Sequence, residues 1–132
     1  MVRLAAMDVI NMGYKMELGL IETILNSVYP THEGWKRLLD CQIDEVDIDF
    51  VFFRKGQLPV AALIMESPYV SREDLKLVQH LKDLYNQKMN GRHLHVMLVY
   101  QELLVRPQRM PKGMSVLSLT EAKEQKRVEP IN

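Results

Sequence analysis

The chain has 132 residues, with 17 Lys and Arg against 17 Asp and Glu, so its formal net charge is zero. A chain of this length is typical of one domain, and we expect a single domain over residues 1–132. The balanced charge excludes a global field that steers the protein to nucleic acid or membrane, but it leaves room for a local basic patch. The one cysteine, Cys41, cannot form an internal disulfide, which is typical of a reducing compartment.

The N-terminal segment does not have the pattern of a secretion signal. Arg3 and Asp8 interrupt residues 1–12, and no small-residue cleavage site follows. Apolar residues recur there at helical spacing and predict a short amphipathic helix that Gly13 ends. No window approaches the roughly 20 apolar residues that cross a bilayer. We therefore expect a cytoplasmic protein without membrane contact.

The first half of the chain then predicts a helix and a pair of strands. Residues 17–29 carry one apolar helical face and stop at Pro30, which predicts a helix. Residues 35–43 are ambiguous, although their later part is expected to enter a sheet. Residues 45–53 alternate polar and apolar side chains and are rich in β-branched and aromatic residues, which predicts a strand. The next strand is Val60–Met65, whose continuous apolar run predicts a central position with both faces covered.

The second half predicts a helix followed by two more strands. Ser71 reads as the N-cap of a helix that runs to a glycine stop at Gly91. Residues 94–100 and 114–119 predict strands, and a helical turn is expected from Thr120. A strand, a helix and an apolar strand in succession form a βαβ unit, which implies a parallel pair. We therefore predict an α/β fold with a mixed central sheet flanked by helices on both faces.

Acidic residues are embedded in the two strands that form the predicted hairpin. Asp47 and Asp49 lie within the first strand, and Glu66 follows the apolar run of the second. With a turn at residues 55–57, odd positions of the first strand are expected opposite even positions of the second. All three carboxylates then share one face, which suits the oxygen ligands that Mg²⁺ prefers. The alternative is an exposed strand end whose carboxylates are satisfied by water.

The element order αβββαβ with these acids resembles the PD-(D/E)xK nuclease superfamily, which has the restriction-endonuclease-like fold. The sequence motifs of very-short-patch-repair-like members are similar to two segments of this chain, Ile48-Asp49-Phe50-Val51 and Ala62-Leu63-Ile64-Met65-Glu66. The resemblance covers residues 17–100 and implies a Mg²⁺- or Mn²⁺-dependent nuclease acting on nucleic-acid phosphodiesters. It implies catalytic and metal-binding roles for Asp49 and Glu66, with Asp47 and Glu22 as further metal ligands.

The sequence departs from that superfamily at one catalytic position. The pattern Glu-x-Lys is replaced by Glu66-Ser67-Pro68, so the lysine is missing. In some members the lysine lies on the following helix, where Lys76 is the candidate. The alternative is a non-catalytic member that serves as a protein- or nucleic-acid-binding module. Loop cations could contact phosphates, and a homodimer is compatible with a domain this small. These cations are Arg106, Arg109 and Lys112.

Overall fold

The computed structural model describes residues 11–105, 107 and 109–121, and for residues 11–18 it describes the backbone alone. These residues fall into two compact units, one ending at Glu33 and one beginning at Gly34. The expected single domain over residues 1–132 stays a prediction. None of the helices in the described part combines the length and the apolar composition that a bilayer crossing requires.

The first unit contains helix α2, Asn11–Val28, and the short 3-10 helix η1, Thr31–Glu33. Of the apolar face predicted for residues 17–29, Ile21 and Leu25 are buried together with Ile24, whereas Val28 is 47% exposed. Helix α2 passes through Gly13, so the predicted break there is wrong. One glycine costs a helix only about 1 kcal/mol relative to alanine, which 18 residues can absorb. The short helix expected over residues 1–12 falls almost entirely outside the described residues.

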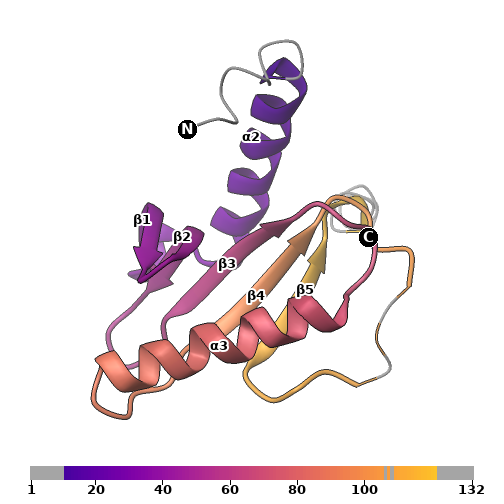
Figure 1. Ribbon diagram of the computed structural model, residues 1–132. Coiled ribbons are helices and arrows are strands. Elements are labelled where there is room, and N and C mark those ends of the chain that lie inside the picture. Colours follow the sequence, from indigo (N-terminus) through magenta and orange to yellow (C-terminus); the bar gives the residue numbers. More distant parts are fainter. Residues whose placement is uncertain (1–10, 106, 108, 122–132) are drawn as a thin grey trace. The chain divides into compact units, whose positions relative to one another are not determined.

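The second unit is built on a five-stranded sheet in the order β1-β2-β3-β4-β5 (Figure 1). The strand bounds are β1 Lys36–Ile43, β2 Val46–Phe53, β3 Val60–Met65, β4 His95–Tyr100 and β5 Met114–Ser118. The first three strands are antiparallel neighbours, whereas β3, β4 and β5 run parallel. Helix α3, Arg72–Lys88, connects β3 to β4 and lies along one face of this sheet. The predicted α/β class, mixed sheet and order αβββαβ are confirmed.

The central position of β3 explains its uninterrupted apolar sequence. Ala61 and Leu63 point to the face that α3 covers, where they join Val78 and Leu81 of the helix in one core cluster. Leu81 is fully buried, and burying a leucine side chain contributes about 1.5–3 kcal/mol to folding. Helix α3 therefore covers one face of β3, and its two neighbouring strands give β3 the central position that its sequence predicts.

Hydrogen bonds at the N-terminus of α3 fix where that helix begins. Ser71 Oγ accepts from the backbone N–H of Asp74 at 3.1 Å, and Asp74 Oδ2 accepts from the backbone N–H of Ser71 at 3.0 Å. This reciprocal capping box satisfies donors that a helix start leaves unpaired. Asp74 Oδ2 also accepts from the hydroxyl of Tyr100 at 2.9 Å, which ties α3 to the end of β4. The predicted N-cap at Ser71 is confirmed.

Candidate active site where strands β2 and β3 separate

The register of the β2–β3 hairpin differs from the one expected. Val51 pairs with Ala61, and Phe50 pairs with Ala62, so odd positions of β2 lie opposite odd positions of β3. The hairpin is centred on Gly56, whose φ of +82° is a left-handed turn conformation. This turn lies within the expected residues 55–57, but its centre pairs odd positions with odd ones, so the predicted odd–even pairing and the common face for Asp49 and Glu66 are wrong.

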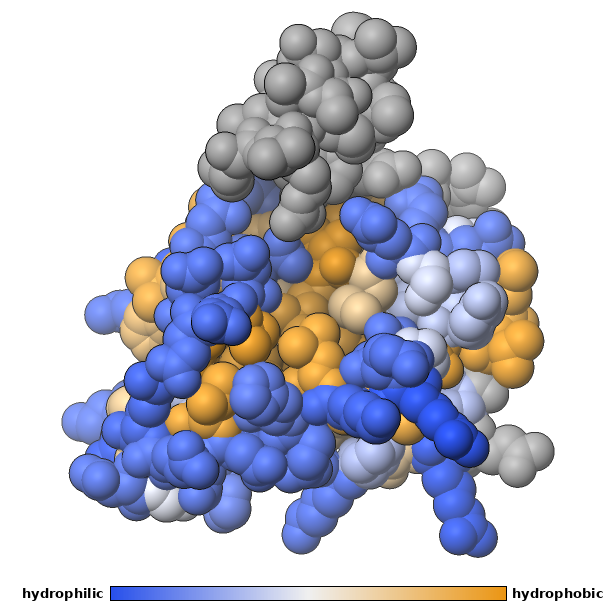
Figure 2. Space-filling view, in the orientation of Figure 1, coloured by the Kyte–Doolittle hydropathy of each residue, from blue (hydrophilic) through white to orange (hydrophobic). Residues whose placement is uncertain are grey.

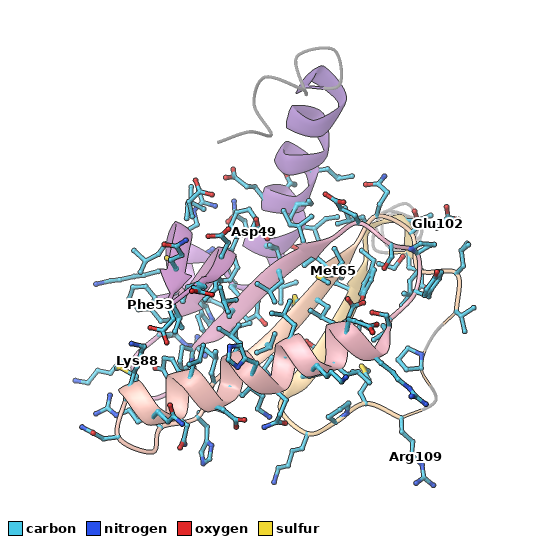
Figure 3. The ribbon with its side chains drawn as sticks, viewed as in Figure 1. Asp49, Phe53, Met65, Lys88, Glu102 and Arg109 are labelled. Atoms are coloured by element: carbon cyan, nitrogen blue, oxygen red, sulfur yellow. The ribbon has the colours of Figure 1, made fainter. Side chains whose placement is uncertain are left out.

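Asp49 lies at the point where the β2–β3 ladder ends. The last backbone pair is Phe50 with Ala62, yet β2 continues to pair with β1, and β3 continues to pair with β4. Beyond that pair, the backbone N–H of Ile64 donates to Asp49 Oδ2 at 2.8 Å. The half-buried Asp49 carboxylate thus replaces a backbone carbonyl of β2 as the acceptor for β3. Figure 3 labels Asp49 on β2 and Met65 on the neighbouring β3.

The other two acids of the hairpin are exposed. Glu66 directly follows the last residue of β3. It is two residues beyond Ile64, a backbone step of about 7 Å in an extended chain. Asp47 is held across the sheet, since its Oδ1 accepts from Gln42 Nε2 of β1 at 2.8 Å. Asp49 and the backbone of Glu66 are therefore near each other along β3, whereas the Asp47 side chain turns to β1.

Asp40 was not among the residues predicted for this region. It occupies the β1 position opposite Asp49, between the pairs Leu39–Phe50 and Cys41–Ile48. Its φ is +52°, a left-handed conformation that aspartate tolerates better than most residues. No sequence signal could have revealed this placement, because it depends on the β1–β2 register. Within the described residues, no group of three or more His, Cys, Asp and Glu side chains could hold a metal ion together.

The remaining predicted site residues are distributed over several elements. Lys76 is exposed on α3, and Arg109 and Lys112 are exposed in the loop before β5. Figure 3 shows Arg109 extending away from the sheet. Glu22 belongs to the first unit and is half-buried there, so the structure does not relate it to Asp49. Arg106 lies outside the described residues.

Basic and apolar side chains line the loops after the parallel strands. The Lys82 ammonium donates to the backbone carbonyl of Lys112 at 2.7 Å and so anchors the loop before β5 to α3. The loops after β3 and β4 expose large apolar side chains, of which Figure 2 shows several among hydrophilic neighbours. Exposed members of these loops are Tyr69, Leu104 and Val105. These residues lie in loop sequences without a regular apolar pattern, so the sequence did not predict that they form a common surface.

The two histidines near β4 have separate environments. His95 Nε2 is 2.9 Å from Ser115 Oγ of β5, and His93 is exposed before the strand begins. Burial and the neighbouring Lys82 charge lower the pKa of His95, because both disfavour the imidazolium. A neutral imidazole paired with a serine is a structural contact between β4 and β5.

The mixed sheet and the order αβββαβ define an α/β fold. The chain is similar to the crystal structure of a repair endonuclease from Pyrococcus abyssi, with a TM-score of 0.51 and 13% sequence identity. The match covers 77% of this chain and 46% of that protein, so the chain spans just under half of its length. At this identity the likeness shows the fold. No family model and no curated protein matches the chain.

Proposed function

We propose that the protein is a nuclease of the PD-(D/E)xK type, which hydrolyses nucleic-acid phosphodiesters with Mg²⁺ or Mn²⁺. Asp49 and Glu66 are the metal ligands in this proposal. The observation that carries it is the hydrogen bond from the Ile64 N–H to Asp49, because it brings that carboxylate to β3 two residues before Glu66. The likeness of the fold to a repair endonuclease supports the same reading.

Each group has a defined chemical role in the proposed reaction. Two carboxylates supply the hard oxygen ligands that a divalent cation prefers, and the cation would activate water and neutralise charge on the scissile phosphate. Lys76 is the candidate for the missing motif lysine, with Asp47 as a further acid. Arg106, Arg109 and Lys112 would bind phosphates through charge, in a salt-dependent way.

The direct test is calorimetric titration of Mg²⁺ and Mn²⁺ into the full chain, followed by cleavage assays on single- and double-stranded DNA and RNA. Asp49→Asn and Glu66→Gln should each abolish metal binding and cleavage, because each removes one anionic ligand while keeping the side-chain shape. Asp83→Asn is the matched control, since Asp83 is exposed on α3 and its partner is Gln79. Metal binding that survives both site variants would overturn the proposal.

A second candidate function is a non-catalytic nucleic-acid-binding module with the same fold. The observation in its favour is Ser67-Pro68 after Glu66, where the catalytic motif expects lysine. Pro68 also has a structural role, because its carbonyl accepts from the Leu104 N–H at 2.8 Å. Oligonucleotide binding that is equal in Mg²⁺ and in EDTA, without cleavage and sensitive to Arg109→Ala, would favour this module over the nuclease.

A further inference from the structure

Strand β1 is an edge strand that is exposed along most of its length. Within the described part of the chain, it has one neighbour in the sheet, β2. Its side chains from Lys36 to Asp40 are all exposed. They include two adjacent leucines, Leu38 at 51% and Leu39 at 49% exposure. An open edge with apolar side chains is a template for pairing with a further strand, which makes this edge an interaction surface.

The charges of β1 are arranged so that the strand is complementary to an antiparallel copy of itself. Lys36 and Arg37 occupy its beginning, and Asp40 lies beyond the two leucines. When two such strands run antiparallel, the basic start of each meets the acidic position of the other. Opposite charges directly across an antiparallel pair are stabilising, whereas like charges are destabilising. The charge pattern therefore selects an antiparallel copy of β1 over a parallel one.

We propose that two copies of this chain associate through antiparallel pairing of their β1 edges, centred on Leu38. A twofold axis between the two strands keeps each side chain on its own face, so the residue at the centre lies opposite itself. With Leu38 at the centre, Lys36 of each copy lies opposite the partner's Asp40. Centring on Leu39 instead would put Leu38 opposite Asp40 and leave Lys36 without an acid across the pair.

The extent of the pairing follows from the backbone of β1. Strand β1 continues to Ile43, but the left-handed φ of Asp40 interrupts its extended backbone, so the proposed pairing with the second copy covers Lys36–Asp40. This short stretch gives a weak dimer, because a small interface is typical of weak association. The association uses no metal and no nucleic acid. It therefore stands or fails separately from the proposed nuclease function when it is measured in EDTA.

A disulfide comparison tests the register. In a Cys41→Ser background, Leu38→Cys places two cysteines directly across the pair, where Cα atoms are about 4.5–5.5 Å apart and can be bridged. Leu39→Cys is the matched control with equal exposure, but its two cysteines lie on a diagonal of about 7–8 Å. Oxidised glutathione should link Leu38→Cys into dimers and leave Leu39→Cys mostly monomeric. Equal linkage of the two variants would overturn the register.

A charge exchange tests the pairing itself by sedimentation equilibrium. Lys36→Glu should weaken the dimer about tenfold, since two attractive pairs become repulsive and 1.4 kcal/mol corresponds to a factor of ten. Combining Lys36→Glu with Asp40→Lys should restore association relative to Lys36→Glu alone. Lys55→Glu, in the exposed β2–β3 turn, is the control and should not change it. A wild-type chain that stays monomeric at millimolar concentration would overturn the proposal.

Discussion

Replacing Asp49 separates its structural contact from its proposed metal role. The carboxylate accepts from the Ile64 N–H at 2.8 Å and closes the gap that the end of the β2–β3 ladder leaves. Asp49→Ala removes this acceptor and leaves the Ile64 amide without it. Asp49→Asn keeps a side-chain carbonyl that can accept from the same N–H but removes the negative charge. Asp49→Ala should therefore be less stable than Asp49→Asn, whereas both variants should lose metal binding.

The size of the effect can be estimated from the geometry. A hydrogen bond to a charged group contributes about 1.5–3 kcal/mol to folding, and a neutral one contributes about 0.5–1.5 kcal/mol. Asp49 is half-buried, which places its contribution at the lower end of the first range. We expect Asp49→Ala to lower the free energy of unfolding by about 2 kcal/mol and Asp49→Asn to lower it by less than about 1 kcal/mol.

Urea unfolding in EDTA measures this difference, because chelation removes any stabilisation by bound metal. Asp47→Ala is the matched control: Asp47 is exposed, and its bond to Gln42 joins two side chains on the surface. It should change stability by less than about 0.5 kcal/mol. If Asp49→Ala is as stable as the wild type, or if Asp49→Asn loses as much as Asp49→Ala, the structural account of this carboxylate is wrong.

Three further predictions concern contacts of the second unit. Burial and Asp74 raise the pKa of Tyr100 above 10.0, so the folded state keeps this proton to a higher pH than the unfolded state does. The free energy of unfolding should therefore fall above about pH 10, by up to 1.4 kcal/mol per pH unit. Urea unfolding above pH 10 should show a smaller fall for Tyr100→Phe than for the wild type. Lys88→Ala breaks an exposed ion pair with Asp44 and should cost less than about 0.5 kcal/mol by thermal unfolding; a larger loss would contradict solvent screening of this pair. Gly113→Ala should lower the melting temperature, because φ is +84° and the new Cβ meets the Lys82 ammonium; an unchanged value would refute this.

The sequence predicted the elements whose burial imposes a clear pattern. β3 and β4 are buried, and their apolar runs identified them to within a residue. α3 was predicted from its N-cap and apolar periodicity, both of which are local signals. The sequence of β1 was ambiguous because most of its side chains are exposed, so it does not alternate between polar and apolar residues. Its identity as a strand depends on pairing with β2, which no local pattern encodes.

The candidate site was predictable in composition but not in register. The acids were recognisable because they interrupt apolar strands, yet the face that each occupies depends on the centre of the turn. The turn is centred on Gly56, within the expected residues 55–57, and a turn with that centre pairs odd positions with odd ones, so the expected odd–even pairing was wrong. The bond between Asp49 and Ile64 was likewise hidden, since it exists only because the ladder stops at the preceding pair.

The wrong register does not exclude the proposed site, because neither Asp49 nor Glu66 lies within the paired part of β2 and β3. Successive side chains of a strand alternate between its faces, but a side chain at the end of a ladder can turn into the gap beside its strand. Asp49 leaves its face to reach the Ile64 amide between the two strands, and Glu66 follows the last paired residue of β3. The Asp49 carboxylate therefore lies in the gap between β2 and β3, and the backbone of Glu66 follows the strand that borders this gap. Metal binding that needs both residues, with folding that needs only a neutral acceptor at position 49, is the result this geometry predicts.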